Sequence, residues 1–122
     1  MATSSSIKCP LRGEIWDVDL NPTIGVEINK IRPVVVISSN ALRSLPLRLV
    51  APITGWKESF TGKYSHVKIE PNPFNGLTKS SAVDSLQLRG IALDRFLSKR
   101  GELTATEIEE IVCAVAAVIE YG

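Results

Sequence analysis

The chain has 122 residues, 44% of them hydrophobic and 22% charged, and its formal net charge is +1. This length fits one domain with a modest core, and the hydrophobic content excludes a disordered or low-complexity protein. No window approaches the roughly twenty apolar residues of a membrane span, and residues 1–6 lack the apolar region of a signal peptide. We therefore expect a cytoplasmic protein without membrane contact, with residues 1–10 frayed and residues 11–122 forming a single domain.

The content of cysteine and histidine limits the metal chemistry. Cys9 and Cys113 lie at opposite ends of the sequence, and His66 is the one histidine, so no zinc-ligand spacing is present. We expect neither a metal nor a cofactor. The charge is uneven, with nine basic and four acidic residues in 21–89 but three basic and six acidic in 90–122. The first part can attract a polyanion, although scattered lysines are usually only a solvated face.

The first half of the chain predicts strands joined by loops marked with proline and glycine. Residues 14–20 alternate in part between apolar and acidic side chains, which predicts a strand with one buried face. A loop follows, and residues 34–37 form an apolar β-branched run that is typical of a strand buried on both faces. One helical turn is expected in residues 41–45. Residues 47–54 predict another strand, at a sheet edge or bulged because Pro52 cannot donate to a ladder.

The second half predicts further strands and one long helix. Residues 64–70 alternate as a short strand, residues 80–92 predict a longer one, and residues 94–97 predict one helical turn. Thr104 and Glu107 form a capping box before a helix whose apolar positions recur at helical spacing: Ile108, Ile111, Val112, Val115 and Ile119. We therefore expect a mainly β (α+β) fold, a small bent antiparallel sheet or partly open barrel closed by one amphipathic helix.

Arg32 stands out as the candidate for chemistry. Pro33 biases Arg32 towards extended backbone, so its guanidinium is mounted at the lip of the core on a stiff base. A planar fork of five N–H groups suits phosphate better than an ammonium does. An arginine before a strand is also commonly a solvated residue that discourages edge pairing, and spacing alone favours that alternative.

Several stretches, in this order, resemble the MazF/PemK/Kid toxins of bacterial toxin–antitoxin modules. They are R-G-E-I-W at 12–16, N-P-T-I-G-V-E at 21–27, R-P-V-V-V-I-S at 32–38, V-A-P-I-T at 50–54 and Q-L-R at 87–89. The resemblance runs from Arg12 to the C-terminal helix. It implies a CcdB/MazF-type, SH3-like antiparallel barrel, a homodimer, and a metal-independent endoribonuclease (mRNA interferase) that cleaves single-stranded RNA at specific sequences.

The resemblance also implies the products and the partners. Attack by the 2′-hydroxyl leaves a 2′,3′-cyclic phosphate and a 5′-hydroxyl, and a MazE-like antitoxin covers the RNA groove with a flexible, acidic C-terminal segment. The essential arginine of the family falls on Arg32, its strand-end hydroxyl on Thr54 and its loop glutamate on Glu27. Gln87 matches a position near the RNA bases. One departure is Leu86, where several relatives have an acidic residue; Asp84, two residues earlier on the same face, is a candidate to take its place.

Physical chemistry assigns provisional roles to these residues. Arg32 can stabilise charge on the phosphorus, and Thr54 can donate to a phosphate oxygen or simply cap backbone. Arginine does not deprotonate in proteins, so Glu27 and His66 are the candidates for proton transfer. Glu27 can equally be an ion-pair partner of Lys30 or Arg32.

Further residues are candidates for contact with RNA. Trp56 and Phe60 are candidate platforms for stacked bases, with loop anchoring or dimer packing equally open. His66 and Lys30 complete the predicted RNA-binding set, although a lone histidine on a strand is more often a surface residue.

Two other functions compete with the nuclease. One is a CcdB-like toxin that binds DNA gyrase without catalysis, and the other is an inert SH3-like interaction module. The R-P and A-P-I-T stretches favour the nuclease, because a gyrase binder has no need of a phosphate-gripping arginine beside the core strand.

Overall fold

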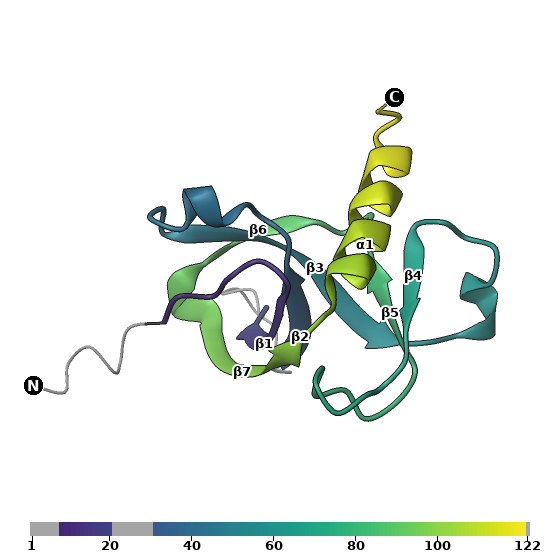
Figure 1. The fold of residues 1–122 in the computed structure, drawn as a ribbon, viewed down its shortest axis with the longest axis horizontal. Helices are drawn as coiled ribbons and strands as arrows, with labels where there is room; N and C mark the ends of the chain where they lie inside the picture. Colours follow the sequence, from purple (N-terminus) through teal and green to yellow (C-terminus); the bar gives the residue numbers. More distant parts are fainter. Residues whose placement is uncertain (1–7, 21–30, 122) are drawn as a thin grey trace, which may run out of the picture.

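The computed structural model describes residues 8–20 and 31–121. In this part of the chain seven strands form an antiparallel sheet in the order β4-β5-β3-β2-β1-β7, and β6 pairs with β3. Figure 1 shows the sheet curling strongly, with the C-terminal α-helix beside β4 and β5. The elements are β1 (Glu14–Asp19), β2 (Ile31–Val36), β3 (Leu47–Gly55), β4 (His66–Ile69), β5 (Ser81–Asp84), β6 (Arg89–Ala92), β7 (Phe96–Glu102) and α1 (Ala105–Val118). The bent sheet with a C-terminal helix confirms the predicted fold class.

Strand β2 is the centre of the core and divides it in two. Val35 and Ile37 join one cluster with residues of β3, β5 and α1, whereas Val34 and Val36 join a second cluster around Phe96. Successive strand residues point to opposite faces, so this run is buried on both sides, as its apolar sequence predicts. Each fully buried side chain of this size stabilises the fold by about 1.5–3 kcal/mol.

Strand β1 departs from the predicted single buried face. Ile15 and Val18 are both fully buried, although they are three residues apart and belong to different core clusters. The pairing of β1 with β7 shifts register between Ile15 and Trp16 and again between Asp17 and Val18. These irregularities turn the strand and change which side chains face inward.

Two prolines end the ladder between β2 and β3. Pro33 lies in β2 and Pro52 lies in β3. The pairing of the two strands runs from Val36 opposite Val50 to Val34 opposite Pro52, where it stops. Neither proline has an N–H to donate, so the ladder does not continue towards Arg32 and Thr54. Pro52 was predicted to mark either an edge strand or a bulge; β3 is not an edge strand, because it pairs on both sides. Pro52 instead lies where the neighbour of β3 changes: the pairing with β6 ends at Val50, and the pairing with β5 begins at Ile53.

The predicted strand at residues 80–92 is two strands. β5 ends at Asp84, whose carboxylate Oδ1 accepts from Leu86 N at 3.0 Å, and Gln87 N donates to Asp84 O at 3.3 Å. This side-chain turn breaks the run without any glycine or proline, so the sequence pattern did not reveal it. β6 then starts at Arg89 and pairs with β3 instead of continuing along β4.

Two predicted helical turns were also misplaced. In place of the turn predicted at residues 41–45, the structure has a short 3₁₀ turn at Asn40–Leu42. The Ser39 hydroxyl caps it by accepting from Ala41 N at 3.0 Å. Residues 94–97 are split between a 3₁₀ turn at Leu93–Arg95 and the start of β7. Strand β7 was missed because Phe96 is the one buried residue in it and no alternation marks the rest.

Helix α1 has the predicted capping box. Thr104 accepts from Glu107 N at 3.1 Å, and the Glu107 carboxylate accepts from Thr104 N at 2.9 Å. Ile108 and Ile111 are buried against the sheet, but Val112 and Ile119 are exposed, so the buried stripe is narrower than the spacing predicts. No helix in residues 8–20 and 31–121 has the length and apolar character to cross a membrane.

The turn before β5 is fixed by Asn75, which is fully buried. Its Nδ2 donates to Glu70 O at 2.9 Å, and its Oδ1 accepts from Leu77 N at 3.0 Å. Gly76 and Gly101 allow this turn and β7 to touch, because a Cβ at either position would lie 2.3 Å from a backbone oxygen of the other segment. The turn therefore holds the following residues, Thr78 and Lys79, over the end of β3.

Candidate active site

Two neighbouring clefts meet at the point where β2 and β3 separate. The first has a volume of about 400 Å³ and the second about 490 Å³, each enough for a nucleotide-sized group. Arg32, Ile53 and Thr54 line both clefts, so they form the ridge between them. Arg32 is exposed and Thr54 is half-buried. The ladder that ends at the two prolines thus leaves these side chains at an open edge.

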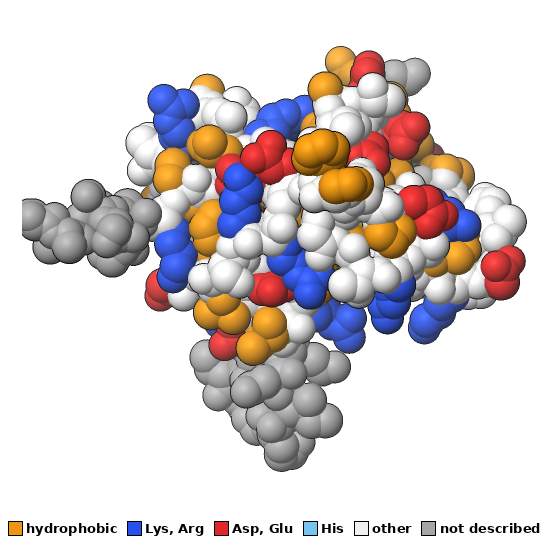
Figure 2. Space-filling model, turned by 60° about the horizontal axis from the view of Figure 1, so that its bottom comes forward, with side chains coloured by type: hydrophobic (Ala, Val, Ile, Leu, Met, Phe, Trp, Pro, Cys, Tyr) orange, Lys and Arg blue, Asp and Glu red, His pale blue; other side chains and the backbone are white. Residues whose placement is uncertain are grey.

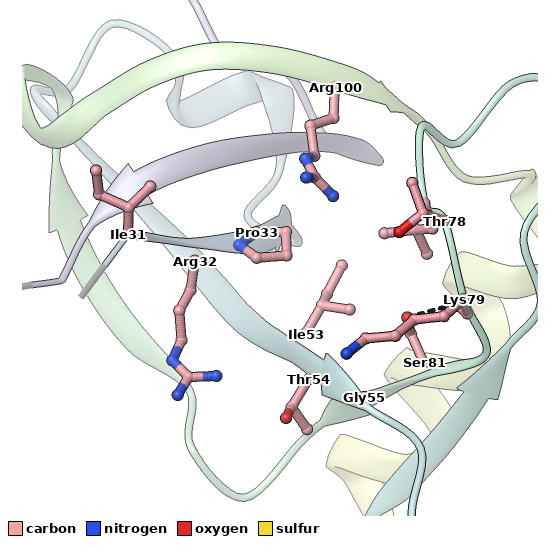
Figure 3. A pocket seen from close by; sticks show the side chains of 11 residues that line it. Ile31, Arg32, Pro33, Ile53, Thr54, Gly55, Thr78, Lys79, Ser81 and Arg100 are labelled. Carbon is pink, nitrogen blue, oxygen red and sulfur yellow. Dashed lines mark hydrogen bonds between the residues drawn. The ribbon is translucent and has the colours of Figure 1, made fainter. Parts of the chain in front are cut away.

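The first cleft is rich in donors. Figure 3 shows the Arg32 guanidinium and the Lys79 ammonium entering it from opposite sides, with Thr54 between them. Lys79 lies over Gly55, where a Cβ would come within 3.2 Å of Lys79 Cε and Nζ. Arg100 also lines this cleft, but its Nε is paired with Asp17 Oδ1 at 3.0 Å. Arg32, Thr54 and Lys79 therefore offer hydrogen-bond donors to anionic groups in this cleft.

The second cleft contains a connected polar cluster. Gln87 Nε2 donates to Asp84 Oδ2 at 2.9 Å, and His66 Nε2 lies 3.6 Å from the same oxygen. His66 Nδ1 is 3.0 Å from the Ser65 hydroxyl. Strands β4 and β5 pair with His66 opposite Asp84, so the sheet register brings the two together. The His66 and Asp84 side chains are each 12% exposed, whereas Gln87 is exposed to the cleft.

The aromatic residues of the 55–62 loop are packed together. Phe60 stacks on the His66 ring with centroids 4.1 Å apart, and Trp56 meets Phe60 edge-on at 5.6 Å. Lys68 Nζ lies 4.9 Å from the centroid of the Trp56 ring. Phe60 lines the second cleft, but Trp56 lines neither. The structure thus favours loop anchoring for Trp56, and stacking of a base on Phe60 stays a prediction.

The structure brings together most of the residues that the sequence singled out. Arg32 and Thr54 share the ridge, and Gln87, Phe60 and His66 line the second cleft. Glu27 and Lys30 lie outside the described residues. The sequence reasoning missed Lys79, which no motif marks and at which only Gly55 hints. It named Asp84 only as a candidate substitute for the acidic residue that relatives have in place of Leu86.

Five lysine and arginine side chains give the two clefts their positive charge. Arg32, Lys57 and Arg89 line the second cleft, and Lys79 and Arg100 line the first. Figure 2 shows Lys and Arg side chains gathered along the lower right edge of one face. Arg48, one of the nine bases of the basic segment, is only 3% exposed and donates to backbone oxygens of Pro10 and Leu45. It supports the fold and adds little to a polyanion surface.

The R-G-E-I-W stretch is structural. Arg12 Nη1 donates to Ile37 O at 2.6 Å, and Glu14 Oε1 accepts from Leu11 N and Trp16 Nε1, each at 2.9 Å. Burial alone would raise the pKa of Glu14. These hydrogen bonds and Lys99, at 3.2 Å from Oε2, outweigh burial and hold the pKa below its ordinary value of 4.5. The motif therefore fastens β1 beside β2, away from both clefts.

Comparison with protein families gives one match that covers most of the chain. The family model described as PemK-like, MazF-like toxin of type II toxin–antitoxin system matches residues 11–119. Endoribonuclease MazF9 of Mycobacterium tuberculosis is 32% identical over 106 residues, covering 82% of this chain and 87% of that protein. Endoribonuclease MazF of Staphylococcus saprophyticus is 31% identical over 105 residues, covering 85% of this chain and 86% of that protein.

Solved structures show the same fold. A MazE–MazF crystal structure from Deinococcus radiodurans has a TM-score of 0.77 at 19% identity and covers 95% of this chain and 100% of its own. A mycobacterial endoribonuclease in complex with its cognate antitoxin has a TM-score of 0.73 at 22% identity, covering 93% and 97%. The bent sheet with its C-terminal helix is therefore a known architecture.

Proposed function

Because this chain belongs to the PemK-like, MazF-like toxins of type II toxin–antitoxin systems, we propose that it is an endoribonuclease that cleaves single-stranded RNA. Two relatives at about one-third identity, each matched over most of its length, carry the name endoribonuclease. The observation that carries the assignment to a site is the ridge on which Arg32 and Thr54 stand between two clefts. An RNA strand crossing this ridge has a phosphate at the ridge and nucleotides on either side.

The scissile phosphate lies against Arg32 and Thr54. The 2′-oxygen attacks the adjacent phosphorus while the bond from phosphorus to the 5′-oxygen breaks, which leaves a 2′,3′-cyclic phosphate and a 5′-hydroxyl. The Arg32 guanidinium stabilises the extra charge on the non-bridging oxygens, and the Thr54 hydroxyl donates to one of them. Lys79, on the other side of Thr54, binds a neighbouring phosphate.

Two proton transfers complete the reaction. One proton leaves the 2′-hydroxyl, and one arrives on the departing 5′-oxygen. Arginine does not serve as a base in proteins, so Glu27 is the proposed proton carrier. His66 has both ring nitrogens next to protein groups, Ser65 and Asp84, and we assign it to the wall of the cleft.

The second cleft receives the bases beside the cut. Single-stranded bases are read by their edges and by stacking, and Gln87 offers an amide and Phe60 an aromatic ring. The gyrase-binding alternative is not favoured, because the matched family is that of the PemK-like and MazF-like toxins.

The proposed partners are a second copy of the chain and an antitoxin. Leu42, Leu45, Leu47 and Leu49 are each about half exposed, which supports a homodimer contact on this side of β3. An acidic, flexible MazE-like segment fits clefts lined by Arg32, Lys57 and Lys79. Cys9 and Cys113 are free and exposed, which fits the proposed cytoplasmic location.

One experiment separates these functions. The purified protein is incubated with a long single-stranded RNA in EDTA, and the product ends are mapped. Discrete cuts with cyclic phosphates that disappear in Arg32→Ala support the nuclease, with Arg32→Lys retaining charge but losing most of the rate. The control Lys63→Ala removes an exposed charge outside both clefts and leaves cleavage intact. Intact RNA, with or without inhibition of gyrase, would overturn the proposal.

A further inference from the structure

Asp84 is a buried residue whose two carboxylate oxygens both accept hydrogen bonds. The residue is 8% exposed, at the end of β5. Oδ1 accepts from Leu86 N at 3.0 Å, and Oδ2 accepts from Gln87 Nε2 at 2.9 Å. His66 Nε2 lies 3.6 Å from Oδ2 on the opposite strand, and the Ser65 hydroxyl in turn lies 3.0 Å from His66 Nδ1. The carboxylate thus has one orientation, set by its own turn and by β4.

This arrangement decides which way the Gln87 carboxamide faces. A carboxylate offers only acceptors, so the amide group that approaches Asp84 at 2.9 Å must be the NH₂ and not the carbonyl. With Nε2 turned towards Asp84, Oε1 points away from it. Gln87 is exposed and lines the second cleft. The cleft is therefore presented with a fixed acceptor, although a free glutamine amide offers donor and acceptor equally.

We propose that Asp84 is a positioning residue for base recognition, which orients Gln87 so that its carbonyl oxygen accepts a hydrogen bond from an amino group on one RNA base. This inference rests on the endoribonuclease function proposed above and names a determinant of its sequence preference. Adenine, cytosine and guanine each carry an exocyclic amine that can donate to this oxygen, at C6, C4 and C2 respectively, whereas uracil carries none. Phe60, in the same cleft, bounds the space beside the amide.

The substitution Asp84→Asn tests the orientation with little change in shape. The introduced amide oxygen can still accept from Leu86 N, while its NH₂ faces Gln87 where Oδ2 was. A donor at that place requires an acceptor, so the Gln87 amide turns over and presents its NH₂ to the cleft. The preference for an amino-bearing base should therefore weaken or reverse.

The experiment begins with a cut sequence mapped for the wild-type protein on a long RNA. Short RNAs of that sequence then carry single changes that remove the amine, inosine for adenosine or guanosine and uridine for cytidine, at each position in turn. The ratio of kcat/KM values gives the discrimination at each position for the wild type, Asp84→Asn and Gln87→Ala. Asp94→Asn is the matched control, because Asp94 is an exposed aspartate outside both clefts.

We expect one position at which the wild type and Asp94→Asn favour the amino base by about tenfold. At that same position Gln87→Ala removes the preference, and Asp84→Asn lowers it to near unity or reverses it. A uniform slowing of every RNA by Asp84→Asn, with the ratios unchanged, would show a merely structural residue and overturn the inference. So would a preference for the base without the amine at the position that Gln87→Ala affects most.

A second measurement serves if Asp84→Asn does not fold. In the ¹⁵N–¹H spectrum of the wild type, one Gln87 side-chain amide proton should exchange more slowly with solvent than its partner, with assignment from the signals lost in Gln87→Ala. Equal, fast exchange of both protons would overturn the proposed orientation. If the wild type cuts no RNA at all, the proposed function itself fails. The spectrum still tests the orientation of Gln87 separately, because it does not depend on cleavage.

Discussion

Replacement of the Thr54 hydroxyl is the sharpest test of the ridge. Thr54 lies on β3 opposite Ala82 of β5 and is half-buried. Thr54→Val keeps the β-branched shape and the strand preference, so the backbone and both clefts are retained. Only the hydroxyl that faces the clefts is lost.

The size of the effect follows from the role of that hydroxyl. One donor to a developing negative charge contributes about 2.7–4 kcal/mol in a preorganised site, which corresponds to a loss of about a hundredfold to a thousandfold in kcat. If Thr54 only capped backbone, its removal would cost about 1 kcal/mol of stability and little rate. The two roles therefore differ in which measurement changes.

The assay measures single-turnover cleavage of one short RNA together with unfolding in urea. We expect the free energy of unfolding of Thr54→Val to stay within about 0.5 kcal/mol of the wild type, while its cleavage rate falls at least about a hundredfold. Thr54→Ser, which keeps the hydroxyl, should stay within about tenfold of the wild type, and the exposed Thr61→Val should change neither value. A Thr54→Val protein that cuts at nearly the wild-type rate would refute the role of the hydroxyl.

Three further predictions concern charge and stability. Lys79→Gln should weaken RNA binding and lower the salt dependence of log K by about 0.7, the share of one phosphate contact, while Lys63→Gln leaves the slope unchanged. Asn75→Ala should lower the free energy of unfolding by about 2–3 kcal/mol in urea, because buried groups of Glu70 and Leu77 lose their partner. The pKa of Glu14 is lowered in the folded state, so its contribution is present above pH 4.5 and is lost as pH falls through the folded pKa. Glu14→Gln should therefore be less stable than the wild type at neutral pH, and this difference should shrink in acid; a constant difference would contradict the assignment.

The sequence predicted the elements whose signals are local. The β-branched run after Pro33 and the capping box of Thr104 and Glu107 both describe the structure correctly. Strand β7 carries no local pattern and depends on pairing with β1. The break after Asp84 depends on one side-chain hydrogen bond, which apolar spacing does not reveal.

The site, like the fold, was predictable only where the signal lies in a short stretch of sequence. The family resemblance assigned Arg32 and Thr54 to one site, and they share the ridge. The contact of His66 with Asp84 depends on the register between β4 and β5, which no short stretch of sequence specifies. Lys79 enters its cleft because a distant glycine, Gly55, leaves space for it.

The most direct test of the central claim places one neutral phosphate at the proposed contact. A short RNA with a 2′-deoxyribose at the cut position cannot be cleaved, and a second version carries a methylphosphonate in place of the scissile phosphate. If Arg32 binds that phosphate, the wild type should bind the neutral version at least about tenfold more weakly, whereas Arg32→Ala should bind both equally. An equal loss of affinity in the wild type and in Arg32→Ala would contradict the placement of the scissile phosphate on the ridge.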